Sequence, residues 1–164
     1  MTRDELIEAL QLAPHVEGGY FRRTFDSAHR NRVQTEQGER LTLSSIYYLL
    51  TADSPTGHWH LNQSDILHFW HLGEPVTYHL IGPDGCIETH VLGPDVAAGQ
   101  CLQLAVKGGT WKASHLPAGD YGLISEAVAP GFDYADMTLG EQRQLEQLFP
   151  QHRALIRAYC KPSV

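Results

Sequence analysis

The sequence predicts an antiparallel β-barrel or sandwich that carries a helix at each end. Two observations predict the β-structure: strand-like runs fill residues 41–128, and clusters of Gly, Pro, Asp and Ser separate these runs. Short strands with turn signals every 8–12 residues or so are typical of antiparallel sandwiches and barrels. Helical patterns flank this region on both sides. With 164 residues, we expect a single domain spanning residues 1–164.

The N-terminal segment has the signature of a helix start. Residues 2–5 read TRDE, the form of a capping box, and Leu6, Ile7 and Leu10 follow at helical spacing. We expect a helix over residues 2–12. The double glycine at positions 18–19 then introduces a strand at residues 20–25, and the polar residues 26–40 predict a loop.

Alternating or continuous apolar runs between turn signals predict the central strands. The expected strands are residues 41–50, 57–60, 66–72, 76–81, 87–92, 101–106, 111–115 and 121–128. The tail becomes helical again. Residues 138–141 read TLGE, a second capping box, and a last helix is expected at residues 152–159, after Pro150.

Charge and composition exclude several classes of protein. The chain has 12 basic and 19 acidic residues, and its net charge of -7 argues against a nucleic-acid-binding surface. No apolar run approaches the roughly 18 residues of a membrane span, and no signal core precedes the first helix. We therefore expect a soluble cytoplasmic protein. The odd set of Cys86, Cys101 and Cys160 contains no CxxC pair and suggests idle or buried thiols.

The residues Gly57-His58-Trp59-His60, followed by Asp65, form the most informative motif. In an extended strand, His58 and His60 point to the same face, and Asp65 can return to that face across a short turn. Two imidazoles and one carboxylate are the ligand types of a facial triad for a divalent transition metal. They are equally the parts of a metal-free acid/base site.

Several phrases of the sequence resemble one family. The HxH pair, the following acid and Gly73 are similar to the first cupin motif, G-x5-H-x-H-x3-4-E-x6-G. The phrases PHVEGGYFR, SIYYLL, DVAAG, APGFD and PQHRAL, within residues 14–155, resemble the short cupins known as cupin domain family 5, a domain of unknown function. The resemblance implies an all-β, antiparallel cupin jelly-roll β-barrel with flanking N- and C-terminal helices. It also implies a homodimer, in which the N-terminal strand covers a sheet edge across subunits.

The chain departs from the cupin motifs at the positions that hold metal. Asp65 stands at the usual spacing of the Glu, and the position where related proteins have Glu is Ile66. In the second motif Lys107 replaces Pro, Gly109 matches, and Lys112 replaces the His ligand. The resemblance thus implies a degenerate metal site. A lysine at this place lowers metal affinity and favours an anionic ligand.

Further residues are candidates for the pocket wall. One of the adjacent tyrosines faces the barrel, and we assign Tyr47 a catalytic hydroxyl. Trp111 is the candidate aromatic lining, and Glu17 and Arg22, around the double glycine, are candidate ligand-binding residues. If Asp65 points inward, then residues 67, 69 and 71 share its face, and residues 68 and 70 lie on the other side.

Three functions remain open at this point. The first is binding of a polar or anionic small molecule, for instance a carbohydrate-like one. The second is a metal-free isomerase or epimerase, in which His58 or His60 abstracts a proton, Tyr47 returns one and Lys112 stabilises the enolate. The third is a metal-dependent oxygenase or isomerase that uses iron, manganese, nickel or zinc bound by His58, His60 and Asp65.

Overall fold

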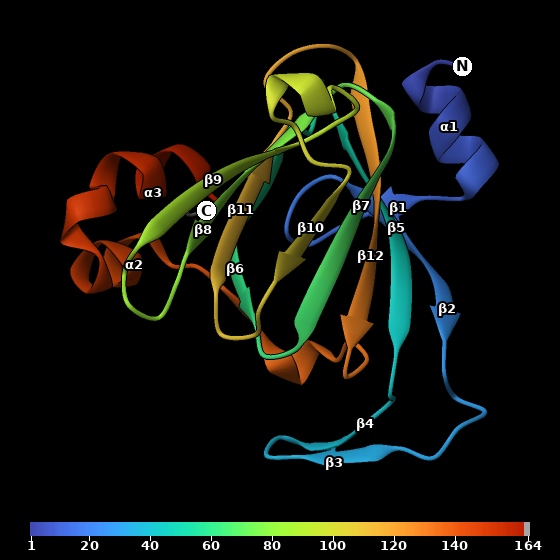
Figure 1. The fold of residues 1–164 in the computed structure, drawn as a ribbon, viewed down its shortest axis with the longest axis vertical. Helices are drawn as coiled ribbons and strands as arrows, with labels where there is room; N and C mark the ends of the chain where they lie inside the picture. Colours follow the sequence, from blue (N-terminus) through green and yellow to red (C-terminus); the bar gives the residue numbers. More distant parts are fainter. Residues whose placement is uncertain (163–164) are drawn as a thin grey trace.

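The computed structural model describes residues 1–162, which form two antiparallel sheets packed face to face (Figure 1). One sheet has the strand order β1-β2-β5-β12-β7-β10, and the other has the order β13-β6-β11-β8-β9. The strands are β1 (Ala13–Pro14), β2 (Tyr20–Asp26), β3 (Val33–Thr35), β4 (Gly38–Arg40), β5 (Ser44–Thr51), β6 (Thr56–Asn62), β7 (Asp65–Gly73), β8 (Val76–Ile81), β9 (Ile87–Leu92), β10 (Gln103–Val106), β11 (Trp111–His115), β12 (Tyr121–Ala129) and β13 (Met137–Leu139).

From β5 to β8, and again from β9 to β12, successive strands alternate between the two sheets, which makes the fold an all-β jelly roll. β5 and β7 belong to the first sheet, whereas β6 and β8 belong to the second. Between the sheets lies a core that includes Tyr48, Leu50, Tyr78, Leu80 and Ile124. The alternation of apolar and polar side chains in the sequence therefore predicts the architecture correctly, because each strand buries one face in this core.

Helices cover the outer faces of both sheets. α1 (Arg3–Leu10) packs Leu6 against Leu49 and Leu123 on the six-stranded sheet. On the five-stranded sheet, α2 (Gln142–Leu148) and α3 (Arg153–Tyr159) bury Leu145 and Ile156, and Figure 1 shows them on the opposite side of the molecule from α1. The flanking helices are thus confirmed. No helix within residues 1–162 is long and apolar enough to cross a membrane.

The two expected capping boxes differ in outcome. Thr2 accepts from the backbone of Glu5, whose side chain accepts from the backbone of Thr2, so the first box is formed. The second is wrong. Thr138 lies in β13, where it pairs with Leu61 of β6, and α2 starts later, with Glu141 as an N-cap that makes no side-chain bond. Pairing with β6 holds Thr138 in a strand, which is incompatible with the cap.

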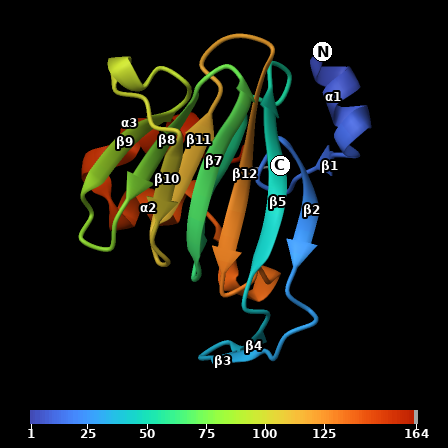
Figure 2. The same cartoon turned by 45° about the vertical axis from the view of Figure 1, so that its right-hand side comes forward.

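Residues 26–40 are more ordered than the expected loop. They include the hairpin of β3 and β4, which extends away from the body of the barrel (Figure 2). The base of the hairpin is fixed by a buried ion pair, in which Arg40 Nε donates to Asp136 Oδ2 at 2.7 Å and Nη2 donates to Oδ1 at 2.8 Å. A long-range ion pair of this kind leaves no periodic signal in the sequence.

Candidate functional site

The site depends on an irregularity in β6. Lys112 of β11 lies opposite His60, but Ser114 lies opposite Gly57, so β6 contains one residue more than β11 between these pairs. Such a β-bulge shifts the alternation of side chains along its strand. Gly57 faces the barrel interior, where an added Cβ atom would lie 2.7 Å from Tyr48 Oη.

The bulge places His58 and His60 in different surroundings. His60 faces the interior and is 5% exposed. His58 faces outward, with Nδ1 3.2 Å from the carbonyl oxygen of Tyr159 at the end of α3. The expectation that His58 and His60 share a face is wrong, and the structure does not bring His58 together with His60 in one site. The spacing rule fails because it assumes an unbroken strand.

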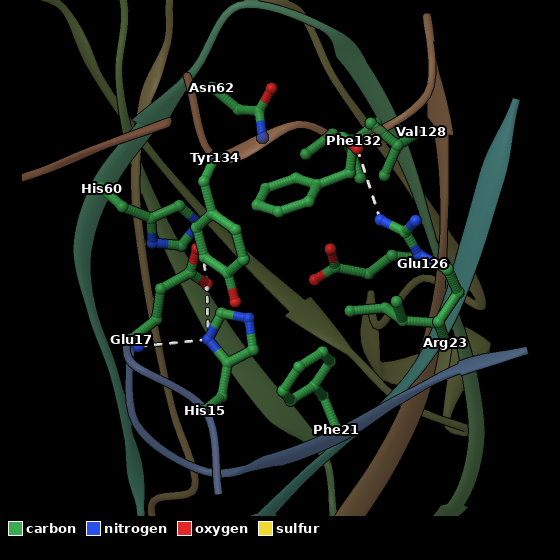
Figure 3. A pocket seen from close by; sticks show the side chains of 12 residues that line it. His15, Glu17, Phe21, Arg23, His60, Asn62, Glu126, Val128, Phe132 and Tyr134 are labelled. Carbon is green, nitrogen blue, oxygen red and sulfur yellow. Dashed lines mark hydrogen bonds and ion pairs between the residues drawn. The ribbon is translucent and has the colours of Figure 1, made fainter. Parts of the chain in front are cut away.

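A pocket of about 240 Å³ opens beside His60 between the two sheets (Figure 3). Half of its wall is apolar or aromatic, consisting of Phe21, Ile46, Ile66, Val128, Phe132 and Tyr134. The other half is polar, consisting of His15, Glu17, Arg23, His60, Asn62 and Glu126. Exposed Arg23 and Tyr134 mark the mouth, whereas buried Glu17 and His60 mark the inner end.

Glu17 and His60 form a polar pair at the inner end. His60 Nδ1 lies 2.8 Å from the carbonyl oxygen of His58, to which it donates, so that Nε2 is left as an acceptor. Glu17 Oε2 lies 3.3 Å from this Nε2 and 3.7 Å from Nδ1 of His15. His15 Nδ1 in turn accepts the backbone N–H of Glu17 at 3.1 Å. The geometry suits a protonated Glu17 that faces an unprotonated His60.

The protonation states support this assignment. Burial, together with the charge of Glu126, raises the pKa of Glu17 to about 8. Burial and the nearby charge of Lys112 lower the pKa of His60 to about 3. Between these two values the pair holds one proton, which lies on the carboxyl group of Glu17. A carboxylic acid that stays neutral near pH 7 is a proton donor of the kind that enzymes and binding sites use.

Glu126 lines the pocket and belongs to a second polar group, whose other members, Lys112 and His68, are buried behind the pocket wall. Lys112 Nζ donates to His68 Nε2 at 3.0 Å and lies 3.8 Å from Glu126 Oε1. His68 Nδ1 lies 3.2 Å from the same carboxylate oxygen, without the alignment of a hydrogen bond. Burial opposes ionisation of Glu126, but the attraction of Lys112 and His68 outweighs it and holds the pKa of Glu126 well below its usual range. Glu126 is therefore a carboxylate, and Glu17 an acid.

The structure also corrects the other candidate residues. Tyr48 faces the interior and donates its hydroxyl to the carbonyl of Gly18, whereas Tyr47 lies on the outer face among the residues under α1. Trp111 is buried on the outer face, against α2 and α3. Tyr47 and Trp111 lie on the expected strands, but their side chains point to the outer face of the sheet rather than into the barrel. Lys112 is inward and buried, as the resemblance implies, but it does not line the pocket as expected of a ligand-binding residue, whereas Glu17 does.

Asp65 and Arg22 lie outside the pocket. Asp65 is exposed and accepts the backbone N–H of Gly108 in the adjacent turn. Ile66 and His68 point inward instead. The expectation that residues 65, 67, 69 and 71 face the interior is therefore wrong. Arg22 is the strand neighbour of Tyr47, and Arg23 takes its place at the pocket mouth, where its guanidinium donates to the carbonyl of Phe132.

The residues at this pocket do not fit a divalent metal ion. Within residues 1–162, no three His, Cys, Asp or Glu side chains converge as a metal-binding group. The proposed ligands His58 and Asp65 point away, and the ammonium group of Lys112 is buried in the barrel interior. A cation at His60 would meet this positive charge.

Sequence reasoning missed His15, His68 and Glu126. His15 and Glu126 are distant in the sequence from the HxH motif, and neither belongs to a motif that marks a site. His68 had a signal, since it sits one strand period beyond Ile66, the position already known to replace the family's Glu. If Ile66 rather than Asp65 is taken as the inward residue, the alternation of side chains along the strand places His68 inside the barrel.

Comparison with known proteins gives a consistent result. The family model for the cupin superfamily group DUF985 matches residues 4–140. An uncharacterised protein of Saccharomyces cerevisiae is 38% identical over 169 residues, which cover 94% of this chain and 84% of the yeast protein.

Two solved structures are similar over their whole length. A hypothetical protein from Leishmania major has a TM-score of 0.92 and 35% identity, covering 99% of this chain and 100% of that one. A Shewanella oneidensis protein has a TM-score of 0.90 and 32% identity, with 99% of each chain covered. Sequence and structure agree, and the chain belongs to the DUF985 group of the cupin superfamily.

Proposed function

We propose that this cupin binds a small organic molecule in the barrel pocket, with the polar head of the molecule held by Glu17 and Glu126. The observation that carries the proposal is a neutral, buried carboxyl group at the inner end of the pocket, next to His60. A buried polar group in a pocket needs hydrogen-bond partners. A ligand that brings an oxygen atom to this group supplies one.

The two carboxyl groups define the chemistry of the ligand head. The one proton of Glu17 faces His60 Nε2 in the pocket without ligand, and a ligand oxygen that takes over this proton must be an acceptor, so Glu17 selects a carbonyl or carboxylate oxygen. Ionised Glu126 accepts, so it selects a hydroxyl or N–H group. Figure 3 shows the two side chains approaching the same space from different walls. A hydroxy-carbonyl compound, whether a sugar derivative or a hydroxy acid, satisfies both.

The rest of the pocket selects the body of the ligand. Phe21, Phe132 and Tyr134 offer aromatic contact, and Arg23 at the mouth offers a positive charge. The volume of about 240 Å³ lies below the roughly 300–1,000 Å³ of pockets for drug-sized ligands. We therefore expect a compact ligand with one apolar or planar side.

The test is a ligand screen by thermal shift, followed by isothermal titration calorimetry. The panel contains hydroxy acids, sugars, sugar acids and apolar carboxylic acids. We expect a hydroxy-carbonyl compound to bind, and Glu17→Leu to weaken it at least about tenfold, because the aliphatic side chain cannot donate a hydrogen bond. Tyr47→Phe, on the outer face, is the matched control. A best ligand that binds Glu17→Leu as well as wild type would contradict the proposal.

A second candidate function is metal-free proton transfer, and the Glu17–His60 pair favours it. Glu17 donates its proton to the carbonyl oxygen of the ligand, while Glu126 accepts the proton from the adjacent carbon. The C–H bond breaks, its electron pair forms the C=C bond of an enol, and reprotonation at either carbon gives an isomer. Glu126 is a weak base beside Lys112, so the substrate must already have an acidified C–H bond.

Exchange with solvent tests this second candidate. In D2O, mass spectrometry of each bound compound should show deuterium at the carbon next to the carbonyl. Glu17→Gln and Glu126→Gln should both abolish the uptake, and His58→Gln should leave it unchanged, since His58 faces outward. A ligand that binds tightly but exchanges no hydrogen would leave binding as the function and end this candidate.

A further inference from the structure

The inward face of β6 and β7 preserves the spacing of a cupin metal site but not its ligands. Counted from His60, the first inward residue after the bulge, the pattern H-x-H-x3-E-x6-G falls on His60, Asn62, Ile66 and Gly73. His60, Asn62 and Ile66 all line the pocket. Two of the three ligand positions on these strands thus hold an amide and an aliphatic side chain.

The fourth position holds a cation. Lys112 lies opposite His60 across the β6–β11 pair, and its side chain is 4% exposed. Its ammonium group donates to His68 at 3.0 Å and lies 3.8 Å from Glu126. A buried ammonium needs an opposite charge close by. Glu126 supplies it, and its pairing partners His68 and Ile46 on the flanking strands fix its place in the sheet.

We infer that Lys112 is the built-in cation of this barrel: its ammonium group takes the place of a divalent metal and keeps Glu126 ionised toward the pocket. Lys112 is a positioning residue, since it acts on the ligand through Glu126. The inference goes beyond the proposed function, because it holds whether the pocket binds its ligand or converts it.

The buried charges explain why the ammonium group of Lys112 excludes a metal ion from this pocket. A metal ion at His60 would have no carboxylate ligand at Ile66, and it would lie near a positive charge that is shielded from water. The charge of Glu126 is already balanced by Lys112, so Glu126 offers a second cation no uncompensated negative charge. With Glu17 neutral, the charges of Lys112 and Glu126 cancel, so the buried cluster has no net charge that a metal ion would relieve.

Metal uptake is the first test. Untagged protein is dialysed against manganese, iron(II), nickel or zinc, then against buffer, and analysed for metal content. We expect wild type to hold less than about a tenth of an equivalent, and the variant N62H/I66E/K112H to hold about one. The matched control N62H/I66E retains Lys112, and we expect it to bind at least about tenfold more weakly. Stoichiometric metal in wild type that is lost in His60→Gln would overturn the inference.

The ionisation of Glu126 is the second test, and it needs no metal. In carboxyl-labelled protein, NMR should show Glu126 ionised in wild type down to the acid limit of folding. In Lys112→Met its titration midpoint should rise above about pH 5, because the strongest of the attractions that oppose burial is lost. Lys112→Arg, which keeps the charge, should restore the low midpoint. A midpoint that stays low in Lys112→Met would overturn the inference.

A double variant covers the case in which Lys112→Met fails to fold. Removing Lys112 alone leaves the charge of Glu126 buried without its partner, whereas Lys112→Met/Glu126→Gln removes both charges. We expect the double variant to fold and to melt above the single variant. A double variant as unstable as the single one would show that the two charges are not coupled, and would refute the inference.

Discussion

The inner and outer faces of β6 and β11 both carry histidine side chains and use them differently. On the outer face, Trp59 and Trp111 lie under α2 and α3, and His115 stacks on Tyr159 at a centroid distance of 4.8 Å. On the inner face, His60 and Lys112 lie side by side in a network that includes two carboxyl groups.

The histidines of the two faces differ in the groups that they contact rather than in how deeply they are buried. His79 and His115 form a stack with Tyr159, and each contacts rings or hydroxyl groups. His60 and His68, by contrast, each lie within 4 Å of a glutamate oxygen. A histidine beside an acid can exchange a proton with it, whereas a histidine in an aromatic stack contributes packing. The comparison therefore assigns structure to the outer face and chemistry to the inner one.

The largest expected effect tests the structural role of the outer face. Trp59 is fully buried among the residues of α2 and α3. Trp59→Ala should lower the free energy of unfolding by about 3–5 kcal/mol, because it opens a large cavity. Urea denaturation measures this loss. Near-normal stability would mean that the helices are held without Trp59, and the assignment of this face as structural would be wrong.

The next effect tests the inner face through pH. The pKa of Glu17 is raised from 4.5 to about 8 in the folded protein, so between these values the folded state binds more protons than the unfolded state. Stability from this group is fully present below pH 4.5 and is lost as the pH rises toward 8. The loss between pH 4.5 and pH 7 amounts to about 3 kcal/mol.

Glu17→Gln isolates this contribution from those of the histidines. The amide does not titrate, so the stability difference between Glu17→Gln and wild type should grow in favour of the variant as the pH rises from 5 to 8. Urea denaturation at several pH values gives this difference. A constant difference would mean that Glu17 has an ordinary pKa, and the proton-donor role proposed for it would fall.

The sequence determines the architecture far better than the site. Apolar runs between turn signals mark the strands within residues 41–128 and predict an antiparallel sandwich or barrel, and the resemblance to the cupin family adds the jelly roll. The face of the sheet to which His58, Tyr47 or Asp65 points depends on the alternation of side chains along its strand. One additional residue in a strand reverses this alternation. The bulge in β6 has no sequence signature of its own. A glycine at position 57 is compatible with a turn as well as with the close approach to Tyr48 that the structure shows.

The assembly of the acid cluster lies further beyond sequence reasoning. Glu17 comes from the segment before β2 and Glu126 from β12, so only the closed barrel brings them to one pocket. Lys112 is the one member of this cluster that the sequence places correctly. The resemblance assigns it to a ligand position of the second cupin motif, which predicts that it points inward and lies near His60.

A smaller effect compares the two adjacent tyrosines. Tyr48 donates to the carbonyl of Gly18 at 2.9 Å from inside the barrel. Tyr48→Phe should cost about 1–2 kcal/mol, since it leaves this carbonyl without its partner. Tyr47→Phe, on the outer face, should change stability by less than about 0.5 kcal/mol. Equal costs in thermal or urea denaturation would contradict the assignment of Tyr48 to the interior.

The smallest effect tests the bulge itself. In a regular strand, His58 and His60 would contribute equally to ligand binding or to metal binding. In the bulged strand, His58→Gln removes one bond to the carbonyl of Tyr159 and should cost only about 0.5–1 kcal/mol. It should leave the affinity for the best ligand unchanged, whereas His60→Gln should reduce that affinity, because it removes the acceptor that orients Glu17. Calorimetric titration of both variants distinguishes the two arrangements. A loss of affinity in His58→Gln equal to that in His60→Gln would return His58 to the pocket and remove the bulge from the explanation of this site.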